Sequence, residues 1–225
     1  MSAQRSAFVE GWPVLLSVVV VAIPFGIVAR QSGLTAAEIM GMSVFVFAGA
    51  SQFAMVRLFA AGAAWPIVVV TVFLINLRHL LTAAALRPHF AGVSAARRMA
   101  AAFVLTDEAF AMAIGWFRRG KTDLRYYASF AVALYVLWVA ATAIGALLGP
   151  SIGEPRRFGV DFAITATFIA IVALGVRRRS DALVAVVAAL AAAALAALGA
   201  SVVAVVTAGA LAPLLVLLVH DEPVA

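Results

Sequence analysis

The chain contains no cysteine and few charged residues: only 12% of its 225 residues are Asp, Glu, Lys or Arg. Without cysteine, disulfides, thiol catalysis and cysteine-ligated metal sites are excluded. A soluble domain carries about 25% charged residues, so there is too little polar surface to cover a globule in water. No G-x-x-x-x-G-K-[ST] string for nucleotide phosphates is present, so nothing supports an ATPase. No cofactor is expected.

Long hydrophobic runs make up most of the chain. Hydrophobic residues make up 66% of the chain and its mean hydropathy is +1.13. A helix crosses the bilayer core, about 30 Å thick, with about 20 apolar residues. The chain divides into eight blocks near that length: 12–29, 36–61, 65–86, 99–117, 126–149, 159–176, 181–198 and 200–219.

The predicted class is an all-α polytopic integral membrane protein, with residues 1–225 in a single transmembrane domain. The break between the last two blocks carries no charge. It is either a tight hairpin or part of one long helix, so we expect seven or eight transmembrane helices. The first block ends at Arg30 without a small-residue cleavage pattern, and we expect it to be a span and not a signal peptide.

The net charge of +6 reflects basic residues in short loops, where they act as topology signals. No nucleic-acid partner is expected. For eight spans, the bias in loop charge is small and favours both termini in the cytoplasm. A single re-entrant segment would overturn it.

The second half of the sequence resembles the first. PFGIVARQSG, from Pro24, matches AIGALLGPSIG, from Ala143, and GASQFAMV, from Gly49, matches ITATFIAIV, from Ile164. Transporters often contain two such halves with the substrate site between them. We expect repeat halves at about 12–117 and 126–219. The alternative is a chance match in an alanine-rich chain.

One apolar block is interrupted by small and polar residues. FVFAGASQFAMVRLF contains Gly49, Ser51 and Gln52. Irregular backbone at membrane depth is tolerated only where it faces protein or a water-filled cavity, so this string predicts a broken helix around residues 49–52. The alternative is a helix–helix interface of small residues, with Ser51 bonded to its own helix.

The next two blocks carry ionisable groups, in LINLRHLL and FVLTDEAF. An Arg or Asp at a helix centre costs at least about 2.5–3.5 kcal/mol, so we expect Arg78 to pair with Asp107 or Glu108. The pair is either part of a transport path or a structural latch. His79 has no second histidine at i+3 or i+4, and no metal site is expected.

These clusters define the candidate site. Glu108 and His79 are the expected proton carriers, because carboxylate and imidazole groups exchange protons near neutral pH when they are desolvated. The expected substrate-binding or transport residues are Gly49, Ser51, Gln52, Asn76, Arg78 and Asp107.

Three strings in this order and spacing, GASQFAMV, NLRHLL with its following Pro88-His89, and LTDEAFAM, resemble the AzlC family of branched-chain amino acid permeases. The resemblance extends from about Pro24 to the last apolar block. It implies a multi-pass protein of the bacterial inner membrane that exports branched-chain amino acids with a small, separately encoded membrane partner of the AzlD type. Tyrosine and serine are common in the family just after the histidine, whereas this chain has Thr82 and Ala85. This departure leaves the substrate's identity open.

We therefore expect a secondary, proton-coupled exporter of branched-chain or similar small aliphatic amino acids, the large subunit of a two-component system, and no enzyme activity. The alternatives are a transporter of another small amphipathic metabolite, an intramembrane enzyme using Ser51 and His79, and an inert assembly subunit. The last two blocks are rich in alanine. They are expected to pack against the partner or a second copy, or else to face lipid.

Overall fold

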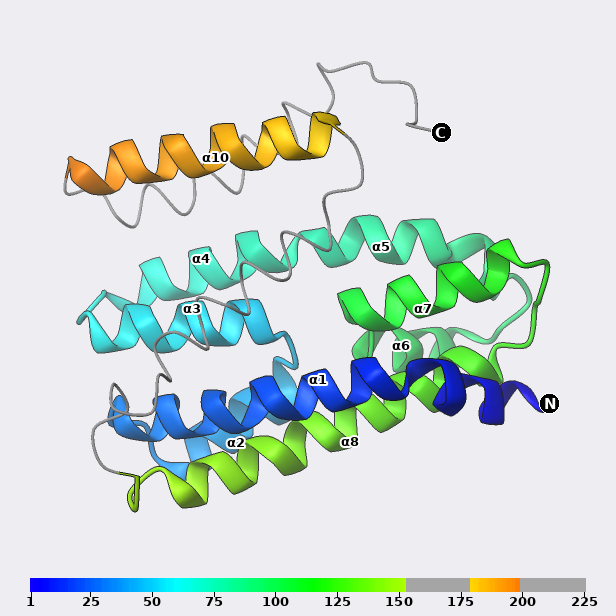
Figure 1. Ribbon diagram of the computed structural model, residues 1–225, viewed down its shortest axis with the longest axis horizontal. Coiled ribbons are helices and arrows are strands. Elements are labelled where there is room, and N and C mark those ends of the chain that lie inside the picture. Colours follow the sequence, from blue (N-terminus) through cyan, green and yellow to red (C-terminus); the bar gives the residue numbers. More distant parts are fainter. Residues whose placement is uncertain (153–178, 199–225) are drawn as a thin grey trace.

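The computed structural model describes residues 1–152 and 179–198, and the regular structure in these residues is entirely helical (Figure 1). The predicted all-α class is confirmed for them. The helices are α1 (Ala3–Gln31), α2 (Ala36–Phe45), α3 (Gly49–Ala60), α4 (Trp65–Asn76), α5 (Arg78–Leu86), the 3-10 helix η1 (Arg87–Phe90), α6 (Ala95–Phe103), α7 (Asp107–Arg118), α8 (Arg125–Leu148) and α10 (Arg179–Ala197).

The long helices α1 and α8 lie side by side and make the most extensive helix–helix contact among the described residues (Figure 1). Glycines bring them into close contact. A Cβ added to Gly145 would meet the carbonyl oxygen of Ile23 and lie 3.1 Å from Cα of Gly26, and one added to Gly26 would lie 2.7 Å from the backbone nitrogen of Ala146. Small residues allow membrane helices to approach this closely.

Gly26 and Gly145 also occupy matching positions in the PFGIVARQSG and AIGALLGPSIG strings. Equivalent residues that touch are expected at an axis relating two halves of a chain. Much of the second half, residues 153–178 and 199–225, lies outside the described residues, so the repeat halves 12–117 and 126–219 remain a prediction.

α2 and α3 form a helical hairpin. Nε2 of Gln52 donates a hydrogen bond of 3.1 Å to Oγ of Ser43, although nine residues of continuous helix would rise about 13.5 Å. The chain reverses at Val46–Ala48, where Phe47 has a left-handed φ of 42°. The break predicted around residues 49–52 therefore lies just before them, and those residues form the first turn of α3.

α6 and α7 form a second hairpin, which opens at the end of the molecule that holds the N-terminus (the N-terminal end; Figure 1). His89, before α6, stacks on Phe117, near the end of α7, with ring centroids 4.0 Å apart. Arg119, just beyond α7, forms a 2.6 Å ion pair with Glu10 near the start of α1. The chain reverses at Val104–Thr106, deep in the molecule.

α4 and α5 together run from one end of the molecule to the other, and Leu77 separates them. The first hairpin opens at the opposite end, where loops 32–35 and 61–64 lie, and the second opens at the N-terminal end (Figure 1). Among the described residues, three segments are long and apolar enough to cross a membrane: Ala3–Gln31, Trp65–Phe90 and Arg125–Leu148.

Two of the eight predicted spans are wrong as single spans. Each of blocks 36–61 and 99–117 holds parts of two short helices joined by a chain reversal, because an apolar block of this length fits either one long helix or a hairpin of two short ones. Blocks 159–176 and 200–219 lie outside the described residues, and α10 has a shorter apolar stretch, Ala182–Leu195. The total of seven or eight spans remains a prediction.

The contact between α1 and α8 predicts opposite effects of alanine at two glycines. Gly26→Ala should lose about 1–3 kcal/mol of stability, since the methyl group meets backbone atoms that have no room to move. Gly115→Ala should gain up to about 1 kcal/mol from helix propensity, because nothing lies within 4 Å of the added methyl group. The melting temperatures of the purified variants in detergent measure both effects. Equal shifts would contradict the close helix contact.

Candidate functional site

The tips of the two hairpins point toward each other near the α4–α5 junction, about halfway along the long helices (Figure 1). α3 and α4 are packed neighbours of 12 residues each, joined by the short loop 61–64. The first turn of α3 therefore lies level with the end of α4. The first turn of α7 is held at the same junction by an ion pair between Arg78 and Asp107.

Tyr135, at the middle of α8, contacts both tips. Its hydroxyl donates a 3.1 Å hydrogen bond to the carbonyl oxygen of Val44, near the end of α2. Its ring lies edge-on to Phe47 in the first tip, with centroids 4.9 Å apart, and 5.8 Å from the ring of Phe103 at the end of α6. Both breaks therefore lie level with the middle of α8.

The ion pair predicted from the sequence is present: Nη1 of Arg78 lies 3.0 Å from Oδ2 of Asp107. The two side chains are 36% and 43% exposed, so the pair is accessible. Arg78 follows the C-terminus of α4 and Asp107 begins α7. The dipole of α7 therefore stabilises Asp107, whereas Arg78 lies between the C-terminus of α4, which favours a cation, and the N-terminus of α5, which does not. The role of both residues in transport remains a prediction.

The first turns of α3 and α7 are capped differently. Thr106 accepts a hydrogen bond from the backbone N–H of Ala109, and the first turn of α7 contains Asp107 and Glu108. The N-cap of α3 is Ala48, with no side-chain hydrogen bond and no acidic residue in the turn. The first N–H groups of a helix have no partner within it, so the α3 tip presents positive N–H groups without a side-chain cap.

Gly49 and Ser51 have structural roles in this turn. A Cβ on Gly49 would lie 2.9 Å from the ring of Trp138, so glycine allows the tip to pack against α8. The Ser51 hydroxyl donates to the carbonyl oxygen of Ala48 at 2.9 Å. This is the structural alternative considered for Ser51. A role of either residue in substrate binding remains a prediction.

Gln52 belongs to a fully buried polar chain. Its amide donates to Ser43, whose hydroxyl lies 3.1 Å from that of Thr142 on α8. Oε1 of Gln52, Oδ1 of Asn76 and Nε of Arg78 are buried and have no hydrogen-bond partner among the described residues. Leaving such a group unpaired costs about 1–3 kcal/mol. The first tip and the neighbouring α4–α5 junction thus carry two acceptors and one donor without a partner among the described residues.

The two candidate proton carriers flank the ion pair. His79 follows Arg78 and Glu108 follows Asp107, and both side chains are partly buried. Glu108 has no ion-pair partner among the described residues. No group of three or more potential metal ligands from His, Cys, Asp and Glu occurs in residues 1–152 and 179–198.

The sequence alone did not single out Tyr135, Tyr127, Ser43 or Thr142. The Tyr127 hydroxyl donates a 2.7 Å hydrogen bond to the carbonyl oxygen of Ala101, in the last turn of α6. Hydroxyl groups inside apolar blocks are visible in the sequence and could have marked these residues. Their partners are carbonyls and side chains of the two hairpins, which only the chain reversals bring within reach.

Removing one hydroxyl should loosen the first tip. Tyr135→Phe leaves the Val44 carbonyl without its donor, which should cost about 1–3 kcal/mol of stability. Hydrogen–deuterium exchange should rise around residues 46–49. Tyr126→Phe is the matched control, because the Tyr126 hydroxyl bonds Glu10 at the N-terminal end, at 2.9 Å. If both variants exchange at the tip like the wild type, Tyr135 does not hold the break.

A family model described as AzlC protein matches residues 13–152. An uncharacterized membrane protein of Archaeoglobus fulgidus is 31% identical over 78% of this chain and 77% of its own length. Inner membrane protein YgaZ of Escherichia coli is 29% identical over 80% and 77%. Branched-chain amino acid transport protein AzlC of Bacillus subtilis is 28% identical over 76% and 66%. No solved structure matches the chain. The match over residues 13–152, which include both hairpins and the α4–α5 junction between them, makes this chain a member of the AzlC family.

Proposed function

We propose that this protein exports branched-chain amino acids across the bacterial inner membrane as a secondary, proton-coupled transporter. The observation that carries the proposal is the convergence of two half-membrane hairpins on the accessible Arg78–Asp107 ion pair. Transporters bind substrates near the midplane at the ends of such discontinuous helices. The relative from Bacillus subtilis, named as a branched-chain amino acid transport protein, supports the substrate class.

The charges around the tips suit a zwitterionic substrate bound in one orientation. The first turn of α3 has no side-chain cap and no acidic residue, so its N–H groups suit the substrate's carboxylate. Asp107 suits the ammonium group, and the unpaired oxygens of Gln52 and Asn76 add acceptors. Without substrate, Arg78 neutralises Asp107. The ammonium group therefore competes with Arg78, which is then free to add a donor for the carboxylate.

The loop charges support an orientation. Because each hairpin returns to its own side, the N-terminal end carries most of the cations, and such loops stay in the cytoplasm. Arg30 and Arg57 lie at the opposite end. The cations of the N-terminal end among the described residues are Arg5, Arg87, Arg97, Arg98, Arg118, Arg119, Lys121 and Arg125.

Assembly with a small AzlD-type membrane protein belongs to the same proposal. α10 is an alanine-rich helix whose small side chains permit close helix contact, and it supports docking of that partner or a second copy. Block 200–219, the other half of the predicted surface, lies outside the described residues. Ala193→Phe in α10 should weaken co-purification of the partner in mild detergent, and an unchanged yield would place the partner elsewhere.

Two alternatives are less well supported. A transporter of another small amphipathic metabolite would use the same site, and substrate competition separates the two. An intramembrane enzyme needs a nucleophile activated by a base. The Ser51 hydroxyl proton is instead donated to Ala48, so a Ser51–His79 pair has no support.

Neutralising the ion pair should abolish most transport. Arg78→Gln and Asp107→Asn each remove a charged hydrogen-bonding group, worth about 1.5–3 kcal/mol, so kcat/KM for leucine should fall about 10- to 150-fold. Uptake of radiolabelled leucine into everted vesicles measures this, with Arg57→Gln at the opposite end as the control. Variants that insert normally and transport leucine at the wild-type rate would remove the site assignment.

Proton coupling makes a separate prediction. Glu108 is the favoured carrier because it lies beside the site without an ion-pair partner among the described residues. Glu108→Gln should abolish the response of transport to a pH gradient and keep leucine exchange. His79→Asn tests the alternative carrier. A wild-type rate that ignores the gradient would remove proton coupling altogether.

A further inference from the structure

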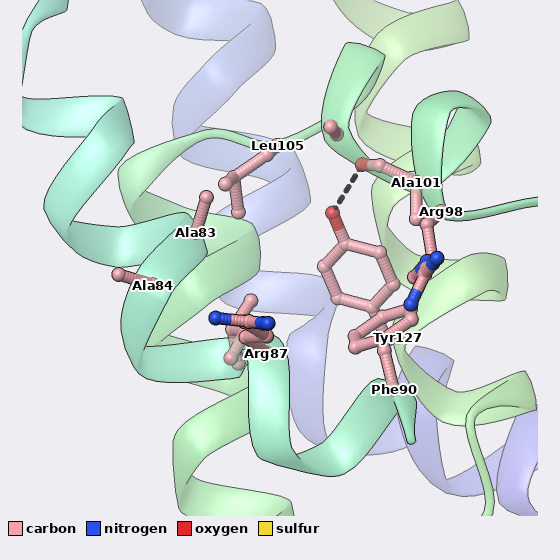
Figure 2. A pocket seen from close by; sticks show the side chains of 10 residues that line it. Ala83, Ala84, Arg87, Phe90, Arg98, Ala101, Leu105 and Tyr127 are labelled. Atoms are coloured by element: carbon pink, nitrogen blue, oxygen red, sulfur yellow. Dashed lines mark hydrogen bonds between the residues drawn. The ribbon is translucent and has the colours of Figure 1, made fainter. Parts of the chain in front are cut away.

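A cavity of about 290 Å³ lies between α5 and α6. Its walls are mostly apolar and include four alanines, with Ala83 and Ala84 on one side and Ala101 and Ala102 on the other. Tyr127 extends between the two sides, and Arg87 and Arg98 lie on opposite sides of its ring (Figure 2). The hydrogen bond from Tyr127 to Ala101 fixes this tyrosine against the end of α6.

The cavity extends from the N-terminal end of the molecule toward the second hairpin tip. Arg87 and Phe90 belong to η1, and Arg98 lies in the first turn of α6, so these residues line its outer part. Leu105 lines its inner part and directly precedes Thr106 and Asp107 in the second tip. A molecule in the cavity would thus lie between the proposed cytoplasmic face and the ion pair.

Two features define the ligand chemistry. Arg87 and Arg98 form no ion pair among the described residues, so both guanidinium groups are available to an anion such as a carboxylate. The alanine walls leave room for a short branched aliphatic tail. The volume is at the lower end of ligand pockets, about 300–1,000 Å³, which favours small aliphatic amino acids over aromatic ones.

We infer that this cavity is a vestibule that collects small aliphatic amino acids from the cytoplasmic side, by their carboxylates, before they reach the hairpin tips. The inference rests on the proposed function, because it supplies the path to that site. An anionic phospholipid, with its headgroup on the arginines and an acyl chain in the cavity, is the competing occupant.

The absence of cysteine from the chain permits a direct binding test. Ala102→Cys in everted vesicles should react with a membrane-impermeant maleimide, and leucine should slow this reaction several-fold more than phenylalanine does. Ala100→Cys is the control, since Ala100 is an exposed residue of the same helix that does not line the cavity. Its labelling should not respond to leucine.

The kinetic test separates the vestibule from the central site. Arg87→Gln and Arg98→Gln should each raise KM for leucine about two- to fivefold, as expected for an exposed ion pair, with kcat unchanged. Arg97→Gln, next to Arg98 but outside the cavity, should leave KM unchanged. A fall in kcat alone would mean that the arginines act in the transport cycle and would overturn the vestibule.

The remaining outcomes distinguish this inference from the proposed function. In one outcome, leucine transport is normal, leucine does not protect Ala102→Cys, and Arg87→Gln and Arg98→Gln behave like Arg97→Gln. This outcome overturns the vestibule and is consistent with the proposed transporter. Protection by vesicles enriched in anionic phospholipid, and not by leucine, overturns it in favour of lipid. If leucine protects Ala102→Cys but is not transported, the result supports the binding cavity and contradicts the proposed function.

Discussion

The fold depends on one constraint: backbone N–H and C=O groups at membrane depth must find partners within the protein. Two helical hairpins end halfway across the molecule, and each reversal releases such groups. Two tyrosines of α8 donate hydrogen bonds to carbonyl oxygens near these reversals. Tyr135 donates to Val44 at the end of α2, and Tyr127 donates to Ala101 at the end of α6. Ser51 satisfies the carbonyl of Ala48 within the first tip.

Some of the polar groups without a partner among the described residues lie around the hairpin tips and give the site its polarity. The N-terminus of α3 has no side-chain cap, and the Gln52 and Asn76 oxygens that lack a partner in residues 1–152 and 179–198 lie in this turn and at the end of the neighbouring α4. The N-terminus of α7 stabilises Asp107, and Asp107 in turn pairs with Arg78 at the α4–α5 junction. In the proposed site, the different capping of the two breaks gives separate positions for a carboxylate and an ammonium group.

Several elements could be predicted from the sequence because their signals are local. The lengths of the apolar blocks predicted α1 and α8 as spans. The small and polar residues from Gly49 to Gln52 located the first break to within a few residues. The insertion cost of Arg78 and Asp107 predicted that they pair, since two charges of opposite sign within apolar blocks are most stable together.

The reversals could not be predicted in the same way. Hydropathy measures how much apolar chain is present, and block 36–61 has enough for one crossing or for a hairpin of two half-crossings. What decides between them is tertiary: the contact of Gly49 with Trp138, the strained turn at Phe47, and the bond between Gln52 and Ser43. The importance of Tyr135 follows only once both tips are placed against it.

The central claim is that both hairpins enter and return on their own side of the membrane, and single-cysteine accessibility tests it most directly. Cysteines at Ala37 and Ala61 bracket the first hairpin, and cysteines at Ala96 and Lys121 bracket the second. The account predicts that a membrane-impermeant maleimide labels the first pair from one side only and the second pair from the other, cytoplasmic side only. If the two members of either pair were labelled from opposite sides, that segment would be a simple span and the account would be contradicted.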